Sequence, residues 1–397
     1  MKATRALCGA ILVLSAVAIQ TACADPLAVK VGVLRETHSR ETISILDIPA
    51  ADDFVAGARM AMEDNNTTGR FVDQSFSIVE AKLAPGEDPI APLNQMLDDG
   101  VRFFIIDLPA GEALAVADAA RAKDALVFNG GAPDERLREE DCRANLIHVA
   151  PSYSMLADGL AQYLIWKQWK RWLLVIGSHP QDKLLGDAYR RSAKKFGAKI
   201  VEERVFEDTG GGRRSDSGSV QVQRQMPVFT QKAPDYDVLV AADESEVFAG
   251  YLPYRTWDPR PVVGSAGLWP ASWDASHELW GAVQLQNRFQ RLFKRGMTAR
   301  DNQAWVAMRM IGDAVAQTRS GDARAVREHM LTPDFVVADF KGQKLTVRPW
   351  NLQLRQPILL TDGRGTVSVS PQEGFLHQTS ELDTLGFDQP ESKCKLH

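Results

Sequence analysis

Short runs of apolar residues alternate with amphipathic stretches along the first 130 residues of the chain. Residues 29–34 (VKVGVL) form a β-branched run, and residues 52–66 follow with Phe54, Val55 and Met62 on one helical face. Most of the apolar runs are continuous, which is typical of parallel strands covered by helices on both faces. The pattern predicts strands at 29–34, 76–81, 101–108 and 125–129 and helices at 52–66, 92–99 and 111–123.

The same alternation starts again after residue 150, which predicts a second lobe of the same kind. Residues 145–150 (NLIHVA) suit a strand that crosses between the lobes, and near residue 280 the chain returns to the first lobe with a helix at 301–319. We expect lobe I to contain residues 25–148 and 278–347, and lobe II residues 149–277 and 348–397. The predicted elements of lobe II are strands at 172–177, 199–206, 237–242 and 261–265, helices at 154–167 and 184–196, and a strand-like, turn-rich segment from residue 345 onward.

The most loop-like stretch is residues 209–219 (TGGGRRSDSGS), where three glycines precede Arg213 and Arg214. Such a sequence can cradle an anion, but no helix start with Lys-Ser or Lys-Thr completes a phosphate-binding loop. A solvated, flexible loop is the favoured interpretation.

The first 24 residues have the order of an export signal. Lys2 and Arg5 precede an apolar run at 7–19, and Ala22-Cys23-Ala24 offers a small-x-small cleavage site. We expect cleavage after Ala24 and a mature protein in the periplasm. Cys23 permits a lipoprotein instead, but Gln20 stands where a lipoprotein signal has an apolar residue, so the lipid anchor is the less favoured alternative.

Length and charge narrow the class of protein. The 397 residues are enough for two hydrophobic cores, and their net charge of −5 falls by two units when Lys2 and Arg5 leave with the signal. Because the chain has no long basic run, nucleic acid is not an expected partner. No apolar run after the signal approaches the roughly 20 residues of a membrane helix, so we expect a soluble mature chain. A monomer is the expected state.

Two cysteines remain after the signal, because Cys8 and Cys23 lie within it. Cys142 and Cys394 would meet an oxidising compartment, where one disulfide is the expected outcome. Such a bridge would pin the C-terminal tail to the middle of the chain, near the hinge between the lobes. Two unpaired thiols are the alternative. A metal site is disfavoured, since neither cysteine has a neighbouring Cys or His at ligand spacing.

Catalytic signatures are mostly absent from the sequence. It contains no Gly-x-Ser-x-Gly elbow, no His-Glu-x-x-His, no dinucleotide-binding glycine pattern and no calcium loop. Ser192 and Lys195 form a Ser-x-x-Lys on a predicted helix, but the companion motifs of that enzyme class are missing. The seven histidines are scattered, so no pair has the helical spacing of a metal site. We therefore expect neither an enzyme nor a protein that carries a cofactor or a metal.

One positional rule provides the candidate ligand-binding residues, because ligands of open α/β sheets bind beyond the carboxyl ends of parallel strands. Two neighbouring acids after the strand at 237–242 can take a cation or hydroxyl groups, and a group of four tryptophans suits either stacking on a ligand or packing between the lobes. The rule selects Arg35, Glu36, Leu108, Ala110, Gly130, Gly131, Ser178, His179, Asp243, Glu244, Ala266 and Trp269. The other tryptophans are Trp257, Trp273 and Trp280, and His38 lies at the same kind of strand end as His179.

The order and spacing of these segments resemble the leucine and branched-chain amino-acid binding proteins of ABC importers. The best stretches are VKVGVL with VAGARMAMEDNN, VFNGGAPDERL, NLIHVAPSYSMLADGLAQYL and WLLVIGSHPQDKLLGDAYRRSAKKFGAKI. The resemblance implies a type I periplasmic binding fold, in which two Rossmann-like lobes with parallel sheets are joined by a multi-strand hinge. It also implies a small-molecule ligand in the cleft and an ABC permease in the inner membrane as a partner.

A narrower resemblance is to binding proteins encoded with pyrroloquinoline-quinone-dependent alcohol oxidation systems. It rests on PYRTWDPRPVVGSAGLWP, WGAVQLQNRF, FKGQKLTVRPWNLQLRQPILL and SVSPQEGFLHQTSELDTLGFDQPESKC. The resemblance implies a link with alcohol catabolism through gene neighbourhood, and it does not imply that the chain binds the quinone.

The sequence departs from the amino-acid binders where their ligand binds. Residues 108–111 (LPAG) replace small hydroxyl residues that grip a carboxylate, Pro133 replaces a threonine, a second-lobe tyrosine position falls near Leu184 or Leu185, and Ala266 stands near the acid that meets the ammonium. A free amino acid is a poor fit, because a buried unpaired ammonium is costly. We expect a receptor for an alcohol-derived, aromatic or otherwise apolar compound. A periplasmic sensor or accessory protein of an alcohol-oxidising system is the alternative, and a hydrolase or oxidoreductase is disfavoured.

Overall fold

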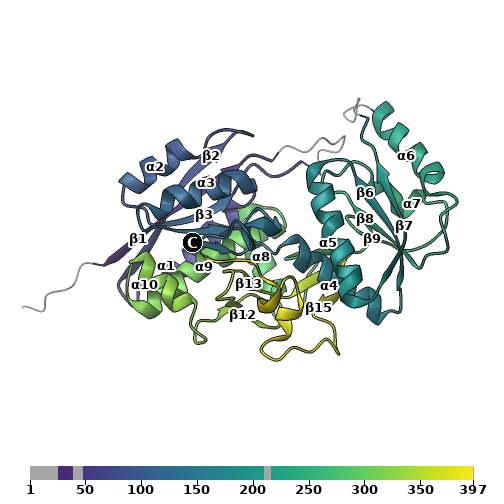
Figure 1. Cartoon of the computed structure of the whole chain (residues 1–397). Helices are drawn as coiled ribbons and strands as arrows, with labels where there is room; N and C mark the ends of the chain where they lie inside the picture. Colours follow the sequence, from purple (N-terminus) through teal and green to yellow (C-terminus); the bar gives the residue numbers. More distant parts are fainter. Residues whose placement is uncertain (1–25, 39–47, 210–215, 397) are drawn as a thin grey trace, which may run out of the picture.

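A computed structural model describes residues 26–38, 48–209 and 216–396 of the chain. The predicted export signal at 1–24, with Cys23, lies outside these residues, as do the glycines and arginines of 210–214. Figure 1 shows two lobes side by side, each built around its own sheet, with strands of the C-terminal part between them at the base. The predicted α/β class, with parallel sheets in two lobes, is confirmed.

The sheet of the first lobe has five parallel strands in the order β2-β1-β3-β4-β5. Side chains of successive residues alternate between its faces, so that Phe103 and Ile105 enter one core while Phe104 and Ile106 enter another. The sheet is thus buried on both faces, as the continuous apolar runs predict. The strands are β1 (Leu27–Glu36), β2 (Gln74–Leu83), β3 (Phe103–Asp107), β4 (Leu126–Asn129) and β5 (Leu146–His148).

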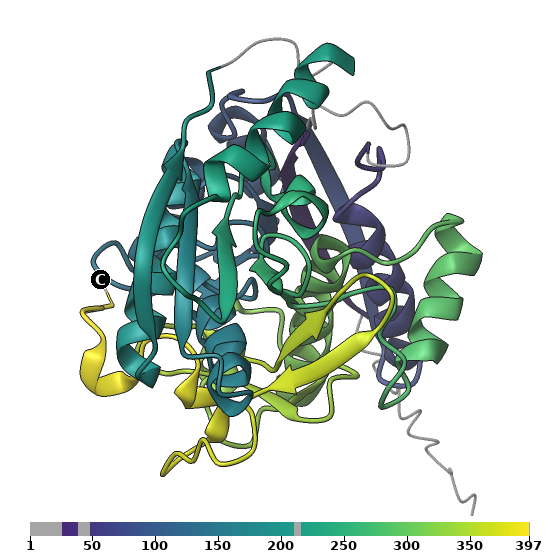
Figure 2. The same cartoon turned by 90° about the vertical axis from the view of Figure 1, so that its right-hand side faces the viewer.

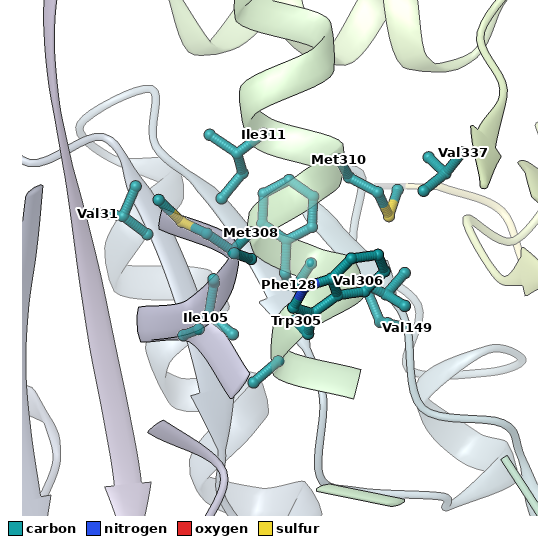
Figure 3. Packing of buried hydrophobic residues seen from close by; sticks show 14 of the residues in the cluster. Val31, Ile105, Phe128, Val149, Trp305, Val306, Met308, Met310, Ile311 and Val337 are labelled. Carbon is teal, nitrogen blue, oxygen red and sulfur yellow. The ribbon is translucent and has the colours of Figure 1, made fainter. Parts of the chain in front are cut away.

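Helices from two distant parts of the chain cover this sheet. On one face lie α2 (Ile90–Asp98) and α3 (Ala110–Arg121), and on the other lie α1 (Val55–Gly69), α8 (Ala282–Phe293), α9 (Ala299–Thr318) and α10 (Ala323–Met330). Figure 3 shows Met308 and Ile311 of α9 beside Val31, Ile105 and Phe128 of the sheet. The predicted return of the chain to the first lobe is therefore present as α8 to α10.

The sheet of the second lobe has four parallel strands in the order β7-β6-β8-β9. Its core on one face includes Leu160 and Ala188, from α4 and α5, and its core on the other face includes Met226 and Leu252, from α6 and α7. The elements are β6 (Arg171–Gly177), β7 (Lys199–Phe206), β8 (Val238–Ala242), β9 (Val262–Gly264), α4 (Tyr153–Trp166), α5 (Pro180–Phe196), α6 (Asp216–Thr230) and α7 (Leu252–Arg255).

Two helices of the second lobe differ from the prediction, because α5 begins earlier than predicted and α6 was not predicted. Helix α5 begins at Pro180, because proline suits the first turn and the buried Asp182 accepts a hydrogen bond from the N–H of His179 (3.0 Å). Helix α6 begins at Asp216, so the loop predicted at 209–219 is wrong for its last four residues. The buried Met226 packs this helix against the core, and such packing extends helices into stretches of weak intrinsic propensity.

The described chain passes between the lobes at the β5–α4, β10–α8 and β13–β14 connections, and again through the C-terminal tail that leads from β15 back to the first lobe. The predicted crossing strand at 145–150 contains β5, which is the edge strand of the first sheet, and the crossing follows it. Strands β10 (Trp269–Ala271), β14 (Ile358–Thr361) and β15 (Thr366–Ser370) form an antiparallel sheet against α4, whereas β11 (Val337–Ala338), β12 (Lys344–Val347) and β13 (Leu354–Arg355) join the first-lobe core. Short 3₁₀ turns occupy Glu135–Leu137 (η2), Ala249–Tyr251 (η3), Glu381–Thr384 (η4) and Gln389–Glu391 (η5).

The C-terminal tail, residues 371–396, contacts both lobes and the segment between them. In Figure 2 it continues from β15 along the base of the molecule. Its Gly386 N–H donates to the buried Asp158 of α4 (2.8 Å), and its Asp383 accepts from Arg348 Nε (2.8 Å) next to the β13–β14 crossing. The tail ends at the first lobe, where Cys394 is bonded to Cys142, 252 residues earlier. The structure thus contains the predicted disulfide, close to the hinge.

No helix in the described ranges combines the length and the apolar character needed to span a bilayer.

Candidate functional site

A cavity of about 500 Å³ opens at the carboxyl ends of β8 and β9 in the second lobe. Leu156 of α4 and Leu185 and Tyr189 of α5 form an apolar wall, and Trp269 and Pro270 of β10 form another. The remaining lining comes from the loops after the two strands, namely Asp243, Glu244, Glu246, Gly264 and Ser265. The cavity therefore combines an aromatic and aliphatic body with a carboxylate end, which is the usual composition of a small-molecule site.

Asp243 and Glu244, the two acids predicted after β8, have different roles. The carboxylate of Asp243 is buried and accepts three backbone hydrogen bonds, from the N–H groups of Val247 (2.9 Å), Phe248 (2.7 Å) and Ala249 (2.7 Å). Burial raises the pKa of Asp243 above its usual value, and the hydrogen bonds from these N–H groups offset only part of that shift. Asp243 thus holds the loop that leads into η3, while the exposed Glu244 presents its carboxyl group to the cavity.

Glu244 keeps contact with solvent at the cavity mouth but has protein on its other sides. This desolvation raises the pKa of Glu244 to about 7. The positive charge of Arg300 opposes the shift, whereas the nearby carboxylates of Glu246, Asp182 and Asp243 add to it. At neutral pH the carboxyl group of Glu244 is therefore close to its midpoint and can either accept or donate a hydrogen bond.

The turn between β6 and α5 forms the rim beside this cavity. Asp182 is buried, and its Oδ1 accepts from both the N–H (2.9 Å) and the hydroxyl (3.0 Å) of Ser245, which ties α5 to the loop after β8. The predicted residues Ser178 and His179 both contact Asp208, through the hydroxyl oxygen of Ser178 (3.0 Å) and Nε2 of His179 (2.8 Å). These two residues shape the rim and do not line the cavity.

On the first lobe, a cluster of charged side chains surrounds Asp107 at the carboxyl end of β3. The buried Asp107 Oδ2 lies 2.9 Å from Nε2 of His38 and accepts from Nη1 of Arg300 (3.1 Å). A Cβ at Gly131 would lie only 2.2 Å from Asp107 Oδ1, so glycine is needed for the loop after β4 to approach this carboxylate. Arg300 comes from the first turn of α9, far away in the sequence.

The predicted pair Arg35 and Glu36 makes contacts within the first lobe. The buried Arg35 donates to Glu80 Oε1 (2.9 Å) and to the carbonyl of Ala51 (2.9 Å), and Glu36 Oε2 accepts from the N–H of Gly86 (3.2 Å). Both residues border a small hollow of about 50 Å³ next to His38 and Asp107. They therefore hold the edge of the first sheet beside the charged cluster.

The loops after β3 and β4 offer little to an anion. The Oδ1 of Asn129 accepts from the N–H groups of Gly131 (3.1 Å) and Ala132 (2.9 Å), so these donors are already used. Leu108 and Ala110 are buried apolar residues. This agrees with the sequence comparison, in which the carboxylate-gripping residues of amino-acid binders are replaced.

A strained turn lies at the start of α1, next to these loops. Phe54 has φ 71° and ψ −60°, and the N–H of Val55 donates to the carbonyl of Asp53 (2.9 Å), which closes a γ-turn. The ring of Phe54 is buried against Gly130, where a Cβ would lie 2.7 Å from a ring carbon. Such backbone strain costs roughly 1–3 kcal/mol and is concentrated at functional sites. The strain supports a functional role for this edge of the first lobe.

Only one of the four grouped tryptophans reaches the cavity. Trp269 lines it, whereas Trp273 is buried in the first-lobe core and Trp257 and Trp280 are more than half exposed elsewhere. Ala266 belongs to the core between the second sheet and helices α6 and α7, whereas the cavity is walled by α4 and α5 on the other face of that sheet.

Of the predicted ligand-binding residues, the structure brings Asp243, Glu244 and Trp269 together around the cavity. Leu185 and Tyr189 are spaced by four on α5, so a helical face could have indicated the pair. Asp107 is the charged last residue of β3 and satisfies the strand-end rule. Arg300 has no comparable signal in the sequence. Among the described residues, no group of three or more His, Cys, Asp or Glu side chains is arranged to hold a metal ion.

Comparison with known proteins supports a periplasmic binding fold. Residues 49–215 match the family model described as periplasmic binding protein. No curated protein matches the chain. Several hundred solved structures do, and they show that the chain has the type I periplasmic binding fold predicted from the sequence.

Three of these structures illustrate the range of sequence identities and of described ligands. A periplasmic binding protein from Burkholderia mallei is 15% identical, with 93% of this chain and 99% of that chain covered and a TM-score of 0.66. A branched chain amino acid ABC transporter periplasmic ligand-binding protein from Burkholderia xenovorans is 19% identical (84% and 89% covered, TM-score 0.65). An ABC transporter solute binding protein from R. palustris, in complex with benzoate, is 12% identical (93% and 100% covered, TM-score 0.65).

Proposed function

We propose that this protein, which has the type I periplasmic binding fold, is the periplasmic receptor of an ABC importer and closes its two lobes over a small solute. The proposed bounds are residues 25–148 and 278–347 for lobe I and residues 149–277 and 348–397 for lobe II, with Trp273 and β13 packed into the first-lobe core from outside its bounds. An inner-membrane permease is the proposed partner. The observation that carries the proposal is the cavity at the carboxyl ends of β8 and β9, where Trp269, Tyr189 and Glu244 converge. Binding at that edge of a sheet is the general rule for open α/β folds.

The composition of the cavity supports an alcohol-derived or aromatic ligand. Trp269 and Tyr189 provide ring faces, Leu156 and Leu185 provide aliphatic contact, and the carboxyl group of Glu244 can hydrogen-bond a hydroxyl. The benzoate complex of the R. palustris protein shows an aromatic ligand on this fold. A link with pyrroloquinoline-quinone-dependent alcohol oxidation is part of the proposal and rests on the sequence resemblance.

A free amino acid fits the site less well. The N–H groups of Gly131 and Ala132, after β4, already donate to Asn129. Ala266, which stands near the acid of amino-acid binders, is buried on the opposite face of the second sheet. At these two positions an amino acid would therefore lack the partners that amino-acid binders provide for its carboxylate and its ammonium, which makes desolvation of the two charges costly.

A thermal-shift panel of alcohols, aldehydes, carboxylates, amines, the quinone cofactor and amino acids tests the proposal. A ligand at 100 times its dissociation constant stabilises the protein by about 2.7 kcal/mol. We expect hits among compounds with a ring or alkyl body and one polar group. Trp269→Ala should weaken their affinity by about tenfold or more, whereas Trp257→Ala, a change at an exposed tryptophan outside the cavity, should not. Stoichiometric, tight binding of leucine would contradict the proposed ligand class.

A further inference from the structure

Two opposite charges belong to the facing edges of the two lobes. Arg300, in the first turn of α9, is held on the first lobe by its hydrogen bond to the buried Asp107 (3.1 Å), and its side chain remains 40% exposed. Glu244 follows β8 of the second lobe and lines the cavity. Because parallel strands end at one edge of each sheet, both side chains lie at the edge where a ligand binds.

The surroundings of each group favour contact between the two. Asp107 takes only one nitrogen of the Arg300 guanidinium, and His38 Nε2 lies 2.9 Å from the same carboxylate oxygen and helps to fix it. The guanidinium has five N–H donors, so further donors remain available. On the other side, Glu244 has Glu246, Asp182 and Asp243 as acidic neighbours, and Arg300 is the cation whose charge favours its ionised form.

We propose that Arg300 and Glu244 form an ion pair across the cleft when the lobes close, and that this pair makes the site select uncharged ligands. The inference rests on the proposed function and specifies its ligand class as neutral compounds that carry a hydroxyl or carbonyl group. Once the pair forms, neither Arg300 nor Glu244 has its charge available for an ionic ligand. A carboxylate ligand meets Glu244, Glu246 and Asp243, and an ammonium ligand meets Arg300, so each competes with the pair.

The remaining polar groups near the pair are consistent with a preference for uncharged ligands. Burial raises the pKa of Tyr153 and of Tyr189, and the nearby charge of Glu244 adds to both shifts. Both tyrosines therefore stay neutral and can only offer hydrogen bonds. Asp182 is occupied by Ser245 and the N–H of His179. Tyr189, which lines the cavity, is then a neutral group that can hydrogen-bond a hydroxyl or carbonyl.

Three compounds of similar shape and different charge test the inference, namely benzyl alcohol, benzoate and benzylamine, titrated calorimetrically at pH 7.5. Wild-type protein should bind benzyl alcohol at least about tenfold more tightly than the two ions. Glu244→Gln leaves Arg300 without its partner across the cleft and should shift the preference toward benzoate by about tenfold. Arg300→Gln should shift it toward benzylamine. Arg324→Gln, which changes an exposed cation paired with Asp124 outside the cavity, should leave the order unchanged. Wild-type preference for either ion, or no change of preference in both variants, would overturn the inference.

A second readout does not depend on a ligand. Spin labels are attached at Lys123→Cys and Lys199→Cys, which are exposed positions on different lobes. Double electron–electron resonance measures the distance between the labels and so reports the fraction of closed molecules. Glu244→Gln and Arg300→Gln should each lower that fraction, and the double variant should lower it no further. Additive effects would show that the two groups do not interact. The two single variants and the double variant form a double-mutant cycle. If the closed fractions in this cycle show coupling while none of the three compounds binds, the proposed ligand class is wrong and the ion pair is supported.

Discussion

Replacing both bonded cysteines by serine tests how much the C-terminal tail stabilises the fold. The Cys142–Cys394 bridge closes a loop of 252 residues. In the chain-entropy model a loop of this length removes about 19 cal/mol/K from the unfolded chain, which corresponds to about 5.5 kcal/mol at 25 °C. For a chain of this size, with an unfolding entropy of about 2.1 cal/mol/K per residue, that loss lowers the Tm by about 7 °C.

The non-covalent contacts of the tail let the variant fold. Asp383 still binds Arg348, and Gly386 still binds Asp158, so the Cys142→Ser/Cys394→Ser protein should keep the native near-UV circular dichroism spectrum. Scanning calorimetry measures the Tm of the variant, of the wild type and of the wild type in reductant, and the last should resemble the variant. A Tm within about 1 °C of the oxidised wild type would refute the view that the bridge stabilises the fold by restricting the unfolded chain.

Three further substitutions test separate parts of the account. Glu244→Gln addresses the pKa of about 7: a carboxyl group with a raised pKa contributes stability that is complete below pH 4.5 and lost as the pH rises through 7. The variant should therefore match the wild type in Tm at pH 4 and exceed it at pH 8, and parallel pH profiles would contradict this. Asp158→Ala removes the buried carboxylate that pairs with both Arg191 and Lys195 and should cost about 3–5 kcal/mol in urea unfolding; a loss below about 1 kcal/mol would show that the cluster is not needed. Gly131→Ala brings a Cβ against Asp107 and should cost roughly 1–3 kcal/mol, whereas Gly111→Ala, a change in helix α3 with open space around the Cβ, should be neutral or stabilising; equal effects would contradict the steric argument.

Much of the fold could be predicted from the sequence, because its signals are local. Continuous apolar runs predict strands buried on both faces, and the restart of the pattern after residue 150 predicts the second lobe. The disulfide followed from counting the cysteines left after the signal. Helix α6 was not predicted, since the composition of residues 209–219 favours a loop and the helix depends on packing of Met226 in the core.

The site could be predicted only in part, because strand-end position does not tell where a side chain points. Asp243 and Glu244 are adjacent, yet one binds backbone N–H groups and the other enters the cavity. Ala266 follows a strand end but is buried on the other face of the sheet. Tyr189 and Arg300 come from helices, and Arg300 reaches Asp107 across 193 residues of chain, a tertiary contact that no local pattern specifies.

In the proposed function, the two lobes close over a ligand bound beside Trp269 and Glu244. Small-angle X-ray scattering of the wild type and of Trp269→Ala, each titrated with the compound that gives the largest thermal shift, tests it most directly. We predict that the radius of gyration of the wild type decreases to a limit at one ligand per protein, and that the variant needs at least about tenfold more ligand for the same decrease. Stoichiometric binding that leaves the scattering unchanged, or an identical response in both proteins, would contradict the account.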